Sequence, residues 1–265
     1  MNPINTNQLT ITQAAAQGEH GRKARSLLLA ATLVALGMMF APYLLAFFFG
    51  GRVGMAMYQI NTVLLYPLRL FITFVHESGH ALAALLTGNQ VASLAVSPNG
   101  EGVTMTTQNF FSAWVIDSAG YLGTALFGAA MLQVGRLRKL QAPGRTALYF
   151  ASAALTIITL LWGWHDPFTM LVGFGLAGTC FALGRFLRPA AANFAAAFIA
   201  VQCGLNAISD IGILLSLTTG GEMKNDAGNM AKMYALPATL WGALWAITAL
   251  VILCVGLRSY WKATK

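Results

Sequence analysis

Charged residues are scarce in this chain. Asp, Glu, Lys and Arg make up 9% of its 265 residues, whereas hydrophobic residues make up 57% and the mean hydropathy is +0.65. An average soluble domain carries about 25% charged residues, so this composition excludes an ordinary soluble globular protein. The net charge of +8 lies in short clusters between apolar runs, as is typical of membrane proteins, and nucleic acid is therefore not expected as a partner.

Cysteine is also rare, and a cleavable leader is not expected. Cys180, Cys203 and Cys254 each lie in an apolar run and form no CxxC pair, which favours packing roles over disulfides. The first apolar run follows a polar segment, 1–25, and reaches Gly50 without a small-residue cleavage pattern. It is therefore interpreted as a transmembrane anchor and not as a removable signal peptide.

Long apolar runs dominate the rest of the chain. A membrane-spanning helix needs about 20 apolar residues, and this rule predicts an all-α polytopic membrane protein with about seven transmembrane helices. The second run contains Pro67 and Arg69, which predicts a kink or an interfacial stretch. We expect a disordered tail over 1–25 and a single membrane-embedded domain over 26–265. The predicted spans lie near 26–50, 56–87, 110–134, 146–163, 167–186, 189–217 and 236–257.

A short β-hairpin is predicted between the second and third spans. Residues 91–97 alternate loosely, 98–100 read Pro-Asn-Gly, and 102–107 resume with β-branched residues. Turn residues between two such runs are the usual signature of a hairpin.

The basic clusters give conflicting signals about orientation. The positive-inside rule makes the side richer in Lys and Arg cytoplasmic. In a seven-span arrangement, Arg22, Lys23 and Arg25 fall on the side opposite the other clusters. Either the tail is translocated or the span count is wrong by one. The other clusters comprise Arg136, Arg138, Lys139, Arg145, Arg185, Arg188, Arg258, Lys262 and Lys265.

The second predicted span carries the motif that indicates chemistry. His76-Glu77-Ser78-Gly79-His80 reads HExxH, and on a helix this spacing places both imidazoles on one face, one turn apart, where they can bind one Zn²⁺. Glu77 is then placed as the general base for a zinc-activated water. Ionisable residues inside a membrane are costly and mark function by default.

A catalytic zinc needs a third protein ligand from another segment. Asp210 is the first candidate because Gln202, Asn206 and Asp210 form one polar stripe on the sixth predicted span. Asp166 is an alternative, although its position before Pro167 also suits an interfacial turn. Asp117, inside the third predicted span, could be a ligand or a group that orients an imidazole.

Small residues in the third predicted span suit close helix packing. Residues 118–123 read Ser-Ala-Gly-Tyr-Leu-Gly, and such a stretch lets another helix approach. We expect this helix to lie against the zinc-binding helix. The six tryptophans are interpreted as interfacial anchors without a chemical role.

Together these motifs resemble the bacterial branch of the site-2 protease family of intramembrane zinc metallopeptidases. The resemblance rests on the string Phe74–Ala81, on Leu86-Thr87-Gly88, on the hairpin and on residues 118–123. It is strong from about residue 67 to 130.

The resemblance implies a core of three helices with zinc held by two His of the first helix and an Asp of the third. Carried over, His76 and His80 are ligands and Glu77 is the catalytic base. Better-known members place the ligand Asp in an Asn-Pro-Asp-Gly or Leu-Asp-Gly string, whereas residues 206–210 read Asn-Ala-Ile-Ser-Asp. The family's active site usually opens toward the cytoplasm, and the resemblance implies the bacterial inner membrane.

The leading hypothesis is therefore an intramembrane metallopeptidase that cleaves membrane-embedded proteins or peptides. A zinc-dependent lipid hydrolase and a non-enzymatic scaffold or transporter with a vestigial zinc site are the alternatives. The intact Glu77 argues against the scaffold, because a purely structural site needs no free carboxylate beside its ligands.

Overall fold

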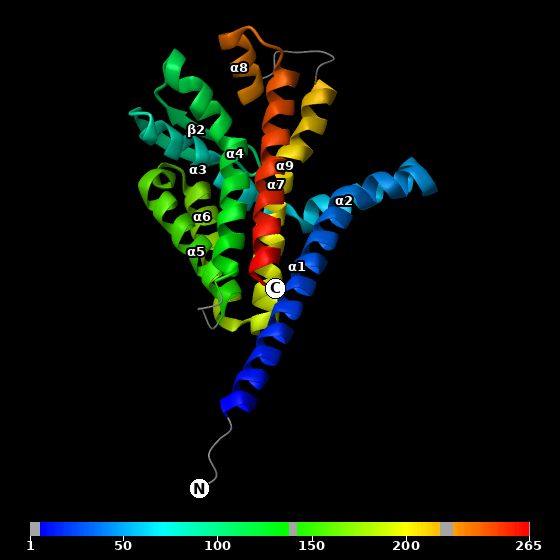
Figure 1. The fold of residues 1–265 in the computed structure, drawn as a ribbon. Coiled ribbons are helices and arrows are strands. Elements are labelled where there is room, and N and C mark those ends of the chain that lie inside the picture. The colour runs from blue at the N-terminus through cyan, green and yellow to red at the C-terminus, as the bar shows by residue number, and fades with distance from the viewer. Residues whose placement is uncertain (1–5, 138–141, 218–224, 265) are drawn as a thin grey trace.

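The computed structural model describes residues 6–137, 142–217 and 225–264, and within them the side chains of 18–19, 21–137, 142–206 and 225–264. Helices dominate, and a single hairpin interrupts the described part of the chain (Figure 1). In chain order the elements are α1 (Thr6–Phe49), α2 (Gly51–Leu64), α3 (Tyr66–Leu86), β1 (Val91–Val96), β2 (Gly102–Thr106), α4 (Phe110–Gly135), α5 (Pro143–Trp162), η1 (Gly163–His165), α6 (Pro167–Phe186), α7 (Pro189–Leu217), α8 (Asp226–Tyr234) and α9 (Ala238–Ala263).

Five helical segments among the described residues are long and apolar enough to cross a membrane. The protein is therefore an integral membrane protein, but the predicted count of seven spans is not confirmed. α3, whose polar residues include the HExxH motif, is not among the five. The five segments are Gly21–Phe49, Phe110–Gly135, Pro143–His165, Pro167–Phe186 and Ala238–Ala263.

The chain between α1 and α3 bends twice. Gly50 lies in the left-handed region at φ 89°, where a side chain would be strained, and it joins α1 to α2. Leu65 then separates α2 from α3, and Pro67 lies in the first turn of α3, where its missing N–H costs nothing. The break expected near Pro67 therefore divides the predicted second span into two helices. α1 itself begins at Thr6, inside the segment for which a disordered tail is predicted.

The predicted hairpin is confirmed. β1 and β2 pair antiparallel, with Leu94 opposite Thr104 and Val96 opposite Gly102. The turn includes Gly100 at φ 82°, a conformation that favours glycine. The Leu94 and Val96 side chains are fully buried, and the Val96 N–H donates to the Thr169 hydroxyl at 2.9 Å.

The hairpin is also tied to α3. The Tyr66 hydroxyl donates to the Pro98 carbonyl at 2.6 Å, and the Thr73 hydroxyl donates to the Gly100 carbonyl at 2.9 Å. Because these two donors lie two turns apart on α3, the hairpin cannot slide along the helix without losing one of them.

Small residues let α4 pack closely on its neighbours. A Cβ added to Gly79 of α3 would lie 2.2 Å from the Ala119 carbonyl oxygen of α4, and one added to Gly128 would lie 2.3 Å from the Ala200 carbonyl oxygen of α7. Both distances are far below van der Waals contact, so these positions require glycine. The expected packing of residues 118–123 against the zinc-binding helix is confirmed.

We expect Gly128→Ala to lower stability, because the added methyl group must push α4 away from α7. Overpacking of this kind costs about 1–3 kcal/mol, which thermal unfolding in detergent would register as a lower midpoint. Gly178→Ala in α6 is the matched control, since nothing lies within 4 Å of its added Cβ. Equal midpoints for the two variants would contradict the close α4–α7 contact.

Candidate metal centre

α3 presents His76 and His80 on one face. Their ring centroids lie 4.8 Å apart at an interplanar angle of 72°. One possible ligand atom from each of His76, Glu77 and His80 lies within 4.8 Å of the other two. The predicted helical geometry of the motif is therefore present, and the group is compact enough to hold a metal ion.

A backbone carbonyl orients His80. Its Nδ1 lies 2.6 Å from the carbonyl oxygen of Ile116 in α4. A carbonyl only accepts hydrogen bonds, so Nδ1 carries a proton, and Nε2 is the ring nitrogen left to face Asp226 or a metal ion. This arrangement, in which the other ring nitrogen donates to a carbonyl, is the usual one for a metal-binding histidine.

Asp226, the first residue of α8, lies against both imidazoles. Its Oδ2 is 3.1 Å from His76 Nε2 and 3.4 Å from His80 Nε2. Two nitrogens and one carboxylate oxygen are a ligand set typical of catalytic zinc. Ligand atoms about 2.05 Å from a tetrahedral zinc are separated by roughly 3.3 Å, so the three side chains fit a zinc ion with little movement.

The Asp226 carboxylate is held in its charged form. Burial raises the pKa of this carboxyl, but its hydrogen bonds and charge interactions with His76 and His80 oppose that effect and outweigh it. The pKa of Asp226 therefore lies below its ordinary range, and the group offers an anionic oxygen to a cation.

Helix capping and apolar packing position α8. The Asn225 side chain caps the helix by accepting from the Gly228 N–H at 2.8 Å. Ala227 and Met230 are fully buried in a cluster that contains Tyr121 of α4 and Trp245 of α9. The Tyr234 hydroxyl at the far end of α8 donates to the Phe110 carbonyl. Contacts at both ends of α8 therefore fix the position of Asp226.

Tyr121 and Trp245 form an aromatic wall beside the histidines. The Tyr121 ring meets the His76 ring edge-on at 4.7 Å and stacks on the Trp245 ring at 4.8 Å and 19°. The Trp245 indole N–H donates to the Ser118 hydroxyl at 2.9 Å. Trp245 thus supports the centre, contrary to the expectation that all tryptophans are interfacial anchors.

Gly120 leaves space for an ion. A Cβ added there would lie 2.3 Å from His76 Nε2 and 2.6 Å from His80 Nε2, the two atoms that face Asp226. Any side chain at this position would push on the imidazoles or occupy the place of the metal. The glycine in the stretch 118–123 therefore serves the centre as well as helix packing.

Glu77 lies on the hairpin side of the centre. The Thr104 hydroxyl of β2 lies 2.7 Å from Glu77 Oε2, to which it can donate, and 3.0 Å from the Glu77 carbonyl. A Cβ added to Gly102 would lie 2.5 Å from Glu77 Oε1, so the strand passes directly over the carboxylate. The Glu77 side chain is buried and held beside, not within, the group formed by the two histidines and Asp226.

A family model described as Peptidase M50B-like matches residues 29–256. The chain belongs to this family. The family is one of site-2 proteases, which confirms the resemblance inferred from the motifs. Neither the comparison with curated proteins nor the comparison with solved structures gives a match.

Membership supports a membrane metallopeptidase of the site-2 protease type. The family is zinc-dependent in general, and zinc suits the donor set formed by His76, His80 and Asp226.

The three acids predicted as candidate third ligands lie in different parts of the fold. Asp210 lies in α7, outside the residues whose side chains the structure describes, and remains a prediction. Asp166 caps α6 and accepts from the Thr169 N–H at 2.7 Å and from its hydroxyl at 2.6 Å. These hydrogen bonds lower the pKa of Asp166, and the interfacial-turn interpretation accounts for the residue.

Asp117 is buried in α4, next to Ile116. Its Oδ2 has no hydrogen-bond partner among the described residues. The orienting role considered for Asp117 is filled by a backbone group, because His80 Nδ1 contacts the Ile116 carbonyl.

Asp226 is not among the third ligands predicted from the sequence. It lies 146 residues beyond His80, and no Asn-Pro-Asp-Gly or Leu-Asp-Gly string surrounds it. A signal was present, however, because Asn225 is a good helix N-cap and Asp226, Ala227 and Met230 then fall in the first turns of a short helix. This helix follows the sixth predicted span on the side of the membrane where the zinc motif ends.

We expect Asp226→Asn to weaken zinc binding by more than about tenfold, because the neutral amide is a poor zinc ligand. Elemental analysis of detergent-purified protein would show about one zinc per chain in the wild type and a large loss in the variant. Asp166→Asn is the control, since its carboxylate serves a helix cap. Zinc lost in Asp210→Asn but kept in Asp226→Asn would instead assign Asp210 as the ligand.

Proposed function

We propose that this protein is an intramembrane zinc metallopeptidase that hydrolyses peptide bonds of membrane-embedded proteins or peptides in a bacterial inner membrane. The proposal rests above all on the convergence of His76, His80 and Asp226 from two distant helices beside the buried Glu77. Family membership supports the same reaction class.

His76, His80 and Asp226 would hold the zinc, which when bound lowers the pKa of a water to about 7 and polarises the scissile carbonyl. Glu77 would take the proton of the attacking water and pass it to the leaving amine. The Thr104 hydroxyl, 2.7 Å from Glu77 Oε2, would keep the carboxylate turned toward the substrate side.

β2 would align the substrate. A helical peptide bond is shielded by its own hydrogen bonds and must be extended before water can attack it. β2 pairs with β1 along one edge, and its outer edge makes no backbone hydrogen bond to another described segment. An extended peptide could add to that edge, and Thr104 would then place its backbone next to Glu77.

Glu77→Gln tests the mechanism. The amide keeps the shape of the side chain but cannot accept a proton, so we expect zinc content to stay at the wild-type level while cleavage falls by at least about 100-fold. Cleavage would be followed on candidate membrane peptides in detergent or vesicles.

Glu101→Gln is the matched control, because Glu101 is exposed in the hairpin turn, where its carboxylate accepts from the Asn99 side chain at 2.8 Å. Retained proteolysis in Glu77→Gln would refute Glu77 as the base. A change in lipid composition that depends on Glu77, without peptide cleavage, would instead favour a lipid hydrolase.

The distribution of basic residues supports a proposal about the membrane face to which the site opens. Arg25 of α1 lies over the Trp261 ring of α9 at 5.6 Å, so Arg25 and the C-terminal turns of α9 lie at the same end of the molecule, away from α8 (Figure 1). Arg136 donates to Ser259 of α9 at 2.8 Å, which places the C-terminal end of α4 at the same end.

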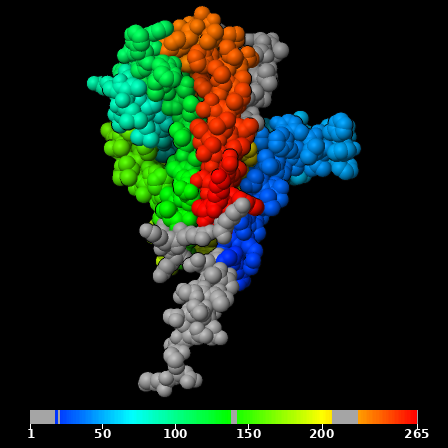
Figure 2. Space-filling view, viewed as in Figure 1, coloured from blue at the N-terminus to red at the C-terminus, as the bar shows by residue number. Residues whose placement is uncertain are grey.

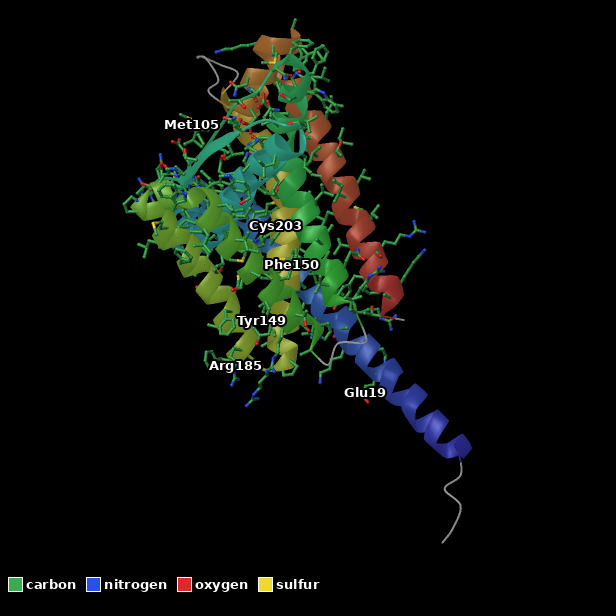
Figure 3. The ribbon with its side chains drawn as sticks, turned by 90° about the vertical axis from the view of Figure 1, so that its left-hand side faces the viewer. Glu19, Met105, Tyr149, Phe150, Arg185 and Cys203 are labelled. Carbon is green, nitrogen blue, oxygen red and sulfur yellow. The ribbon has the colours of Figure 1, made fainter. Side chains whose placement is uncertain are left out.

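The conflict between basic clusters therefore disappears in the folded chain. Figure 3 shows Arg185 at the end opposite Met105 of β2. The hairpin, α3 and α8 carry few cations by comparison, Arg69 and Lys232 among the described residues. By the positive-inside rule, we propose that the cationic end is cytoplasmic and that the metal centre opens to the opposite face, unlike the usual family orientation.

Labelling of introduced cysteines tests this orientation. With Cys254 replaced by Ser, a membrane-impermeant maleimide added to intact cells should label Asn99→Cys in the hairpin turn but not Arg188→Cys at the cationic end. Both wild-type side chains are exposed. Labelling of Arg188→Cys alone would establish the usual family orientation and leave the proposed chemistry unaffected.

A further inference from the structure

An open groove lies between α1 and α9 at the cationic end of the molecule. Its volume is about 480 Å³, within the range of pockets that hold small molecules. Figure 2 shows the C-terminal half of α9 on the surface beside α1. The groove is lined by Leu28, Leu29, Thr32, Leu257, Arg258, Trp261 and Lys262.

The floor of this α1–α9 groove is apolar. Leu28 is buried against α7, whereas Leu29 is 50% exposed, so its side chain is accessible to a molecule bound in the groove. Leu257 contributes from α9. The Thr32 hydroxyl donates to the Leu28 carbonyl at 2.9 Å, so it adds no unsatisfied polar group. Such a floor suits an acyl chain.

The rim of the α1–α9 groove is cationic. Arg258 and Lys262 are exposed one turn apart on α9, and Arg25 reaches across from α1 to stack over Trp261. An indole that is apolar on its face and polar at its edge is favoured at the level of lipid headgroups.

Among the described residues, these three cations have no anionic partner. Within the described part of the chain, neither Arg25, Arg258 nor Lys262 forms an ion pair with a carboxylate, and the two ion pairs found there both belong to the metal centre. By contrast, the Arg145 guanidinium at the same end donates to the Leu187 carbonyl at 2.6 Å. A cationic rim over an apolar floor complements one class of molecule, an anionic phospholipid.

We propose that the α1–α9 groove binds an anionic phospholipid from the leaflet at the cationic end. Its phosphate would lie between Arg258, Lys262 and Arg25, and an acyl chain would lie over Leu29 and Leu257. Each cation near an anionic surface contributes about fivefold to binding. The site is separate from the metal centre and does not depend on the proposed function.

Native mass spectrometry of the full chain tests the proposal. Protein released from nanodiscs that contain both phosphatidylcholine and phosphatidylglycerol should retain one phosphatidylglycerol in preference to phosphatidylcholine. We expect the double variant Arg258→Gln and Lys262→Gln to retain it at least about tenfold less well.

The double variant Arg185→Gln and Arg188→Gln is the matched control. It removes the same charge from exposed residues at the same end, away from the groove, and should retain the lipid within about twofold of the wild type. Equal losses in the two double variants, or no loss in either, would overturn the site. Both variants remove only exposed charges, and an unchanged unfolding midpoint would verify that they fold.

A second measurement locates the lipid. Phosphatidylglycerol with brominated acyl chains should quench the fluorescence of the wild type more than that of Trp261→Phe, because bromine next to Trp261 quenches that indole. Quenching that is the same with brominated phosphatidylcholine would overturn the preference for an anionic lipid. Crosslinks between groove residues of two chains would show that a second copy occupies the groove instead.

Discussion

The close approach of α3 and α4 is the constraint on which the metal centre depends. Gly79 lets the two backbones touch, and this contact brings His80 within 2.6 Å of the Ile116 carbonyl. Gly120, one turn beyond Ile116, then leaves open the space in front of both imidazoles. With larger residues at either glycine, the helices would separate, and the carbonyl that sets the protonation of His80 would no longer reach it.

A second set of contacts brings the carboxylate to the histidines. α8 is too short to be stable alone, and its position comes from burial of Ala227 and Met230 against Tyr121 and Trp245. Tyr121 belongs to both sets of contacts, since it also packs against His76. Helices α3, α4, α8 and α9 are therefore coupled around one small centre, which explains why an aromatic wall belongs to it.

The two ends of the molecule carry different kinds of residue. One end gathers the HExxH residues, the hairpin and α8, and the other gathers Arg and Lys of α1, α5, α6 and α9. Burial of ionisable groups in a membrane is expensive. Near the metal centre, each such side chain contacts a group of opposite charge, a hydroxyl or a backbone carbonyl. Asp117 Oδ2 is the exception among the described residues. The cations instead remain where water and lipid phosphates can solvate them.

The sequence by itself determined the membrane class, the helix that carries His76, Glu77 and His80, and the hairpin after it. These features depend on neighbouring residues: apolar length, an i, i+4 spacing and turn residues. Only the tertiary structure decided that Asp226 lies at the histidines, that Trp245 supports them and that the N-terminal cations join the C-terminal ones. Each of these depends on how distant helices pack. Above all, it depends on whether the stretch from Arg52 to Leu86 crosses the membrane once or bends. The spacing of residues along the chain encodes neither the packing nor the bend.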